Sequence, residues 1–277
     1  MGWLVACGPG DGASQDGDGG TGTDESGAIA TSTEGGDGAS GAVSVTGTTG
    51  GSTGDMAESS GGGDSTGTDD PTTGTDDSGG STDAALVLYV NFDGADLDAG
   101  ADDAPANTTQ IGEMTTPLQP FGNGPKRDAV LARVIEHWAP YDVVVTDTAP
   151  SRGPYTMAVV TPTNPFGGGV QGISPLDCGD VLPSNVVFAF GSEAGEANAE
   201  AVANSVSRQV GAAVGLTHVD APGDVMNAFG SDAPATFTDE CAPLSSGDQC
   251  ATPPAPGCGA GTQNSHAYLL DRFGAAP

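Results

Sequence analysis

The apolar residues of the chain gather between residue 84 and the C-terminus, in short runs separated by turn residues. Runs rich in Val, Leu, Phe and Tyr predict buried strands at 84–92, 141–146, 155–160 and 185–190. A shorter edge strand is expected near 170–173. Apolar residues at helical spacing predict long helices over 125–138 and 193–214, the second with Glu193 at its positively polarised end. Leu269, Leu270 and Phe273 predict a closing amphipathic helix.

Residues 8–83 differ sharply in composition from the rest of the chain. They consist mainly of Gly, Ser, Thr, Asp and Glu, contain no aromatic residue, Lys or Arg, and hold 15 of the 37 acidic residues. Such a segment cannot bury enough apolar surface to offset the entropy lost on ordering, so it predicts a disordered tether. Fragments such as 64–70 resemble pieces of calcium-binding loops but lack the ordered ligand spacing, and a solvated linker is expected there.

The first seven residues end in Leu4, Val5, Ala6 and Cys7, which resemble the lipobox at which a bacterial lipoprotein is cleaved and acylated on Cys. Only six residues precede Cys7, fewer than the basic and apolar regions of a signal peptide need, so we expect the natural start to lie upstream. The alternative is a chance match that leaves one free Cys. The resemblance implies a lipid anchor on Cys7 and a location in the cell envelope, at the outer membrane. No stretch approaches the roughly 18 apolar residues of a membrane-spanning helix.

Residues 84–277 are long enough for one domain with a real core. They carry 22 acidic and six basic residues, a net charge of −16. A surface of this sign excludes nucleic acid and anionic lipid as binding partners. We expect the domain to be a monomer.

The segment 207–227, SRQVGAAVGLTHVDAPGDVMN, has the spacing of a metal-binding helix followed by two turns. Gly215 ends the helix, His218 follows it, and Met226 lies in the second turn. This spacing and the order of the predicted elements resemble the metzincin zinc proteases, in which His, Glu and His occupy the first, second and fifth positions before the turn glycine and a third His. The resemblance covers about residues 84–273 and is closest to metzincin-like domains of bacterial surface lipoproteins. It implies an α+β fold with a mixed, mostly parallel twisted sheet, two long helices and a closing C-terminal helix.

The chain departs from the family at the residues that perform the chemistry. Arg208 and Ala212 stand at the first two ligand positions and Gln209 at the general-base position. Zinc needs about three unprotonated protein ligands, whereas Arg is always protonated and Ala has no donor atom. An amide cannot take a proton from water near neutral pH. His218 is then the sole surviving ligand, and no cofactor is expected.

Other residues could rebuild an active site. His218 could bind zinc together with His137, His266 or Asp220, although His137 at a helix C-terminus and His266 at a helix N-terminus are more typical of structural positions. A serine-type site would pair Ser205 or Ser207 with His218, but nothing in the sequence marks an oxyanion hole.

Five aspartates follow the first predicted strand, at positions 93, 96, 98, 102 and 103. Their spacing matches no defined calcium loop, so a solvated turn is expected in preference to a structural calcium site.

Four cysteines remain if Cys7 is acylated, and an even number favours two disulfides outside the cytosol. Three connectivities are open, and neighbour spacing favours Cys241 with Cys250 and Cys178 with Cys258. A cysteine metal site is disfavoured because the close Cys pairs of zinc sites are missing.

Two functions follow from these residues. The first is a catalytically inactive metzincin-like domain, held to the envelope through Cys7, that binds peptide or protein segments in its former substrate cleft. In metzincins an edge strand at the position of 170–173 pairs with the substrate backbone. The alternative is an active zinc metalloendopeptidase whose ligand set includes His218.

Overall fold

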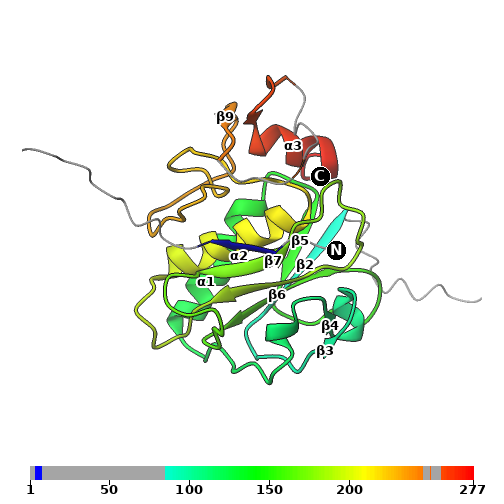
Figure 1. Ribbon diagram of the computed structural model, residues 1–277, viewed down its shortest axis with the longest axis vertical. Coiled ribbons are helices and arrows are strands. Elements are labelled where there is room, and N and C mark those ends of the chain that lie inside the picture. The colour runs from blue at the N-terminus through cyan, green and yellow to red at the C-terminus, as the bar shows by residue number, and fades with distance from the viewer. Residues whose placement is uncertain (1–3, 8–84, 246–249, 251–256) are drawn as a thin grey trace, which may run out of the picture. The chain divides into compact units, whose positions relative to one another are not determined.

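A computed structural model describes residues 4–7, 85–245, 250 and 257–277. It contains one six-stranded sheet with the order β1-β7-β8-β6-β2-β5 (Figure 1). The strands are β1 Leu4–Cys7, β2 Leu86–Asn91, β5 Val143–Thr146, β6 Thr156–Thr161, β7 Gly172–Pro175 and β8 Val186–Phe190. Strands β5, β2, β6 and β8 run parallel, whereas β7 is antiparallel to β8 and β1 is antiparallel to β7. The predicted α+β fold with a mostly parallel sheet is confirmed.

The two faces of the sheet are buried by different parts of the chain. Helices α1 Pro125–Trp138 and α2 Ala199–Ala213 cover one face. Their Val and Trp side chains form one core cluster with the strand residues that point to that side, such as Leu88, Val160 and Ala189. The alternate strand residues point the other way and pack under the segment 95–118. Because side chains alternate along a strand, a sheet buried on both faces reads as an unbroken apolar run in the sequence.

Helix α1 has the predicted bounds, but α2 begins at Ala199 rather than at Glu193. The side chain of Asn198 caps α2 by accepting a hydrogen bond from Ala201 N at 2.8 Å. The carboxylate of Glu193 lies instead at the N-terminus of α1, where it accepts from the backbone N–H groups of Lys126 and Arg127. The expectation that Glu193 opens α2 was therefore wrong, because its charge is used by another helix.

The aspartate-rich segment after β2 forms two short strands, β3 Asp98–Ala99 and β4 Thr108–Thr109, and two short 3-10 helices, η1 Ala104–Ala106 and η2 Gly112–Met114. Four of its aspartates are exposed, as a solvated turn requires, but Asp102 is buried. Asp102 accepts a hydrogen bond from Gln110 N at 2.8 Å, and burial raises the pKa of this carboxyl. The prediction of a solvated turn fails at this residue, which holds the loop together.

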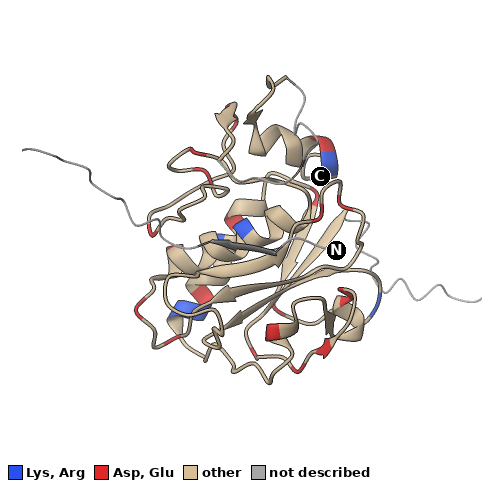
Figure 2. Ribbon diagram, in the orientation of Figure 1, with Lys and Arg blue, Asp and Glu red and all other residues tan. Residues whose placement is uncertain are grey.

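The C-terminal part contains a two-stranded sheet of β9 Ala242–Pro243 and β10 Thr262–Gln263, followed by the predicted closing helix α3 Ser265–Phe273. Acidic positions are spread over the domain and basic ones are few (Figure 2). Within the part of the chain that the structure describes, no helix is long and apolar enough to cross a membrane. The predicted tether over 8–83 lies outside the described residues.

Candidate functional site

The last two turns of α2 carry the three residues that the resemblance to metzincins aligns with two zinc ligands and the general base. Arg208, Gln209 and Ala212 are all buried, with exposed fractions of 1%, 0% and 1%. The guanidinium of Arg208 donates through Nη1 to the carbonyl of Asn227 at 3.2 Å and through Nη2 to Oε1 of Gln171 at 3.0 Å. Asn227 belongs to the turn after Met226, and Gln171 directly precedes β7. Arg208 therefore joins the predicted Met-turn to the edge of the sheet.

His218 lies close to this guanidinium, as the sequence spacing predicts. Its side chain is 8% exposed. Burial, together with the positive charge of Arg208, lowers the pKa of His218 to about 4. The imidazole is therefore neutral at neutral pH, and the nearby charge is a cation that repels a metal ion.

Gln209 and the edge strand are packed against each other. Ser174 Oγ of β7 donates to Gln209 Oε1 at 2.9 Å. A Cβ atom on Gly172 would lie only 2.7 Å from Ser205 Oγ and 2.9 Å from Gln209 Cγ, so β7 crosses α2 at a distance that only glycine allows. The amide at the general-base position thus serves as a structural contact to β7.

The turn after His218 is held by Asp224, a residue whose role the sequence did not reveal. Asp224 Oδ1 accepts from Met226 N at 2.8 Å and from Ser265 Oγ at 3.2 Å, and Oδ2 accepts from the hydroxyl and backbone N–H of Thr238. Met226 is fully buried, and its sulfur would be 2.6 Å from a Cβ on Gly211. Met226 therefore packs directly against α2, as the predicted Met-turn requires.

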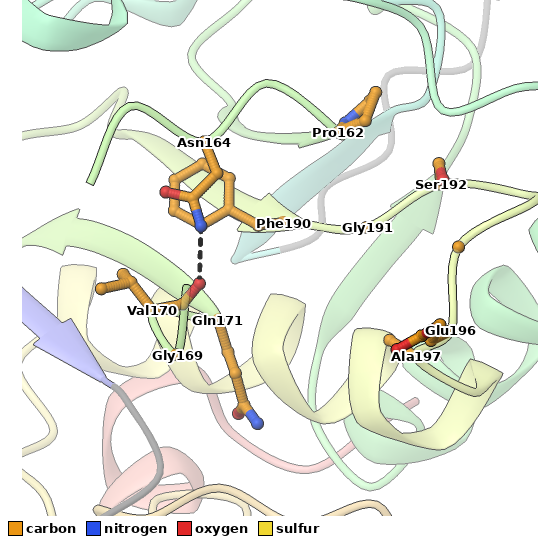
Figure 3. A pocket seen from close by; sticks show the side chains of 11 residues that line it. Pro162, Asn164, Gly169, Val170, Gln171, Phe190, Gly191, Ser192, Glu196 and Ala197 are labelled. Atoms are coloured by element: carbon orange, nitrogen blue, oxygen red, sulfur yellow. Dashed lines mark hydrogen bonds between the residues drawn. The ribbon is translucent and has the colours of Figure 1, made fainter. Parts of the chain in front are cut away.

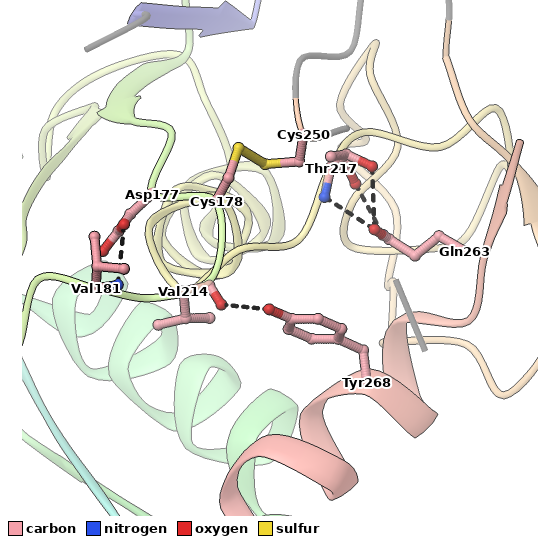
Figure 4. The surroundings of a disulfide bond; sticks show 8 residues. All are labelled: Asp177, Cys178, Val181, Val214, Thr217, Cys250, Gln263 and Tyr268. Atoms are coloured by element: carbon pink, nitrogen blue, oxygen red, sulfur yellow. Dashed lines mark hydrogen bonds between the residues drawn. A yellow bond between two sulfur atoms is a disulfide. The ribbon is translucent and has the colours of Figure 1, made fainter. Parts of the chain in front are cut away.

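The chain turns away from the axis of α2 at Gly215, whose φ is +102°. A Cβ there would also lie 2.3 Å from the hydroxyl of Tyr268, which donates to Val214 O at 3.0 Å (Figure 4). The next segment is fixed by Gln263, whose amide accepts from Thr217 N and donates to Thr217 O. These two contacts from the C-terminal part set the position of His218.

The alternative ligands do not gather around His218. His137 Nδ1 lies 2.8 Å from Ser207 Oγ, between α1 and α2, and His266 Nδ1 lies 2.9 Å from the hydroxyl of Tyr141. Among the residues that the structure describes, no three His, Cys, Asp or Glu side chains come together as a metal site.

The serine-type alternative gains no support from the positions of the two serines. Ser205 donates to Gln171 O at 2.7 Å, and Ser207 pairs with His137 rather than with His218. Both serines are at most 1% exposed, so neither is placed to attack a substrate.

The edge of β7 forms one wall of a possible binding surface. β1 pairs with it in an antiparallel register that sets Leu4 opposite Pro175 and Cys7 opposite Gly172. A hollow of about 340 Å³ lies just before β7, with Val170, Gln171, Phe190 and Glu196 in its lining (Figure 3). The pairing with β1 shows that this side of β7 accepts an extended segment along its row of backbone donors and acceptors.

Two disulfides are present, as predicted, but their pairing differs from the predicted one. One bond joins Cys178 to Cys250 (Figure 4), and the other joins Cys241 to Cys258. Spacing along the chain failed because the pairing of β9 with β10 brings Cys258 close to Cys241. Cys178 follows β7 in the chain, and its bond to Cys250 ties this segment to the C-terminal part.

No protein-family model matches the chain, and no curated protein matches it. The chemistry of the site must therefore be derived from its own residues.

Because His137 and His218 are buried, we expect the folded protein to lose stability in mild acid. Burial lowers the pKa of His137, like that of His218, from 6.5 to about 4. Between pH 6.5 and about 4 the unfolded chain binds protons that the folded chain does not, so the free energy of unfolding falls as the pH is lowered through this window. Each histidine should contribute a loss of about 3 kcal/mol, complete near pH 4.

Urea unfolding of the wild type and of His218→Gln between pH 7 and pH 4 measures this effect. The difference between the two free energies should change by about 1.4 kcal/mol per pH unit across most of the window. Aspartates with raised pKa values act in the opposite sense but are common to both proteins. If the free energy of unfolding depended on pH in the same way in both proteins, His218 would not be held neutral in the folded state.

Proposed function

We propose that residues 84–277 form a catalytically inactive, metzincin-like domain that binds extended peptide or protein segments along β7. One observation carries the first half of this proposal: the Arg208 guanidinium, at the first ligand position, is bonded to Asn227 and Gln171 beside His218. A permanent cation with no acceptor atom cannot bind zinc. Without a metal ion and with Gln209 in place of a base, neither a hydroxide nucleophile nor its proton acceptor is available.

The order of elements along the chain supports the resemblance to metzincins. Apart from the short elements β3, β4, η1 and η2, the order from β2 to α2 is strand, helix, four strands and long helix, and then come the glycine turn, His218 and Met226. The contact of Met226 with α2 and the proximity of Arg208 to His218 agree with the alignment of 207–227 on the family's zinc-binding motif.

Peptide binding is supported by the edge of β7. Among the strands that the structure describes, β7 pairs with β8 on one side and with β1 on the other. A partner segment that took the place of β1 would gain the same backbone hydrogen bonds without requiring any catalytic group. The charge of −16 on the domain disfavours polyanionic partners.

We propose further that the domain is anchored to the envelope through a lipid on Cys7 and acts as a monomer. Two disulfides fit an oxidising compartment. Mass spectrometry of the protein from its own cells, expressed with the upstream sequence, should find an acylated Cys7 at the N-terminus. An unmodified thiol at Cys7 would refute the anchor.

An active zinc metalloendopeptidase remains the second candidate, since a neutral His218 imidazole is the form that binds zinc. The positive charge of Arg208 opposes zinc binding at His218.

The experiment that separates the two functions uses casein, an unfolded protein that offers many extended segments. The immobilised chain that begins at Gly8, in which Leu4–Cys7 no longer pairs with β7, should retain casein in the presence of zinc without cutting it, as judged by surface plasmon resonance and by gel. Replacing Gly172 with Val should weaken retention, because the new side chain displaces β7 from α2. Gly112→Val serves as the control for an added apolar side chain, because Gly112 has open space around it and does not have a positive φ. Cleavage of casein that a chelator abolishes would instead establish the peptidase.

A further inference from the structure

Strand β1 and the lipobox-like sequence are the same four residues, Leu4–Cys7. In the register with β7, Val5 lies opposite Ser174 and Ala6 opposite Ile173. Figure 1 shows β1 as the dark blue arrow beside β7, on the side away from β8. The outermost position of the sheet is therefore filled by a segment that a lipoprotein would lose.

The seated segment indicates what this edge accepts. Leu4, Val5, Ala6 and Cys7 carry no charge, and they run antiparallel to β7 over its whole length of four residues. Antiparallel pairing satisfies backbone donors and acceptors on both strands. Each of the four positions of β7 is already matched, so a second strand cannot pair there at the same time.

We infer that Leu4–Cys7 closes the edge of β7 in the unprocessed chain, and that processing at Cys7 opens it to an uncharged, extended segment of another protein. The step is hydrolysis of the peptide bond between Ala6 and Cys7 by an envelope peptidase, in which water yields the carboxylate of Ala6 and the amine of Cys7. Three of the four paired residues then leave. Anchoring to the envelope and exposure of the binding edge become one event. This inference rests on the proposed function.

Before processing, Leu4–Cys7 has an advantage over a separate ligand in the competition for the edge of β7, because it belongs to the same chain. A strand tethered to the same chain competes at an effective concentration in the millimolar range, so only a ligand that binds much more tightly than it would displace it. After cleavage this advantage disappears. The two core clusters that the structure describes are built from residues between Leu86 and Phe273.

The test is a direct binding measurement with the peptide Gly-Trp-Leu-Val-Ala-Ser-Gly, which copies residues 2–8 with Ser in place of Cys7. Fluorescence anisotropy of the labelled peptide should show binding to a full-length Val5→Pro/Ala6→Pro variant at least about tenfold tighter than to the wild type. The backbone N–H groups of neighbouring strand residues point to opposite sides, so either Val5 or Ala6 donates toward β7. Replacing both residues with proline therefore removes a donor that faces β7. A Gly2→Pro variant, changed outside β1, should behave like the wild type. A chain that begins at Gly8 should bind the peptide like the double-proline variant.

The outcomes separate this inference from the function on which it rests. Equal peptide affinity of the wild type and both opened forms, or no peptide binding by forms that still retain casein, would overturn the closure by Leu4–Cys7 while the proposed function stands. Failure of all forms to bind either the peptide or casein would overturn both. Peptide binding by the opened forms alone supports the inference.

Discussion

A buried guanidinium holds the candidate site together. Arg208 reaches from α2 to the carbonyl of Asn227 on one side and to Gln171 on the other, beside an imidazole that burial keeps neutral. A buried cation is stable only where hydrogen bonds replace its lost hydration. These contacts fix the spacing between the end of α2, the turn at Met226 and the start of β7. In the arrangement that the resemblance implies, a metal ion would connect the helix and the following turn, and here a side chain of the protein connects them.

The rest of the site is built to hold this arrangement rather than to move protons. Asp224 gathers the turn, Gln263 fixes the backbone before His218, and Gln209 supports β7 through Ser174. Each of these side chains is buried and accepts a hydrogen bond from a structural partner, although Nε2 of Gln209 has none. In the proposed function, recognition uses the edge of β7 and the hollow beside it and depends on backbone hydrogen bonds.

Much of the fold could be predicted from the sequence, because strands buried on both faces give continuous apolar runs and α1 is bounded by Pro125 and Pro140. The start of α2 could not be predicted. Glu193 is a residue type that is common at the start of a helix, but its carboxylate caps α1, through a contact between residues more than sixty positions apart. The disulfide pairing failed for the same reason: the pairing of β9 with β10 decides which cysteines meet. At the site, spacing predicted that Arg208, His218 and Met226 share one region. It gave no sign of Gln171 or Asp224, whose roles depend on tertiary contacts alone.

The central claim is that Arg208 stands where a metal ion would need a ligand. Elemental analysis of the full-length protein, saturated with zinc and then desalted, tests it directly when compared with an Arg208→His/Gln209→Glu/Ala212→His variant treated alike. The account predicts no stoichiometric zinc on the wild type and about one zinc per chain on the variant, which regains three histidine ligands. About one chelator-sensitive zinc on the wild type would contradict it.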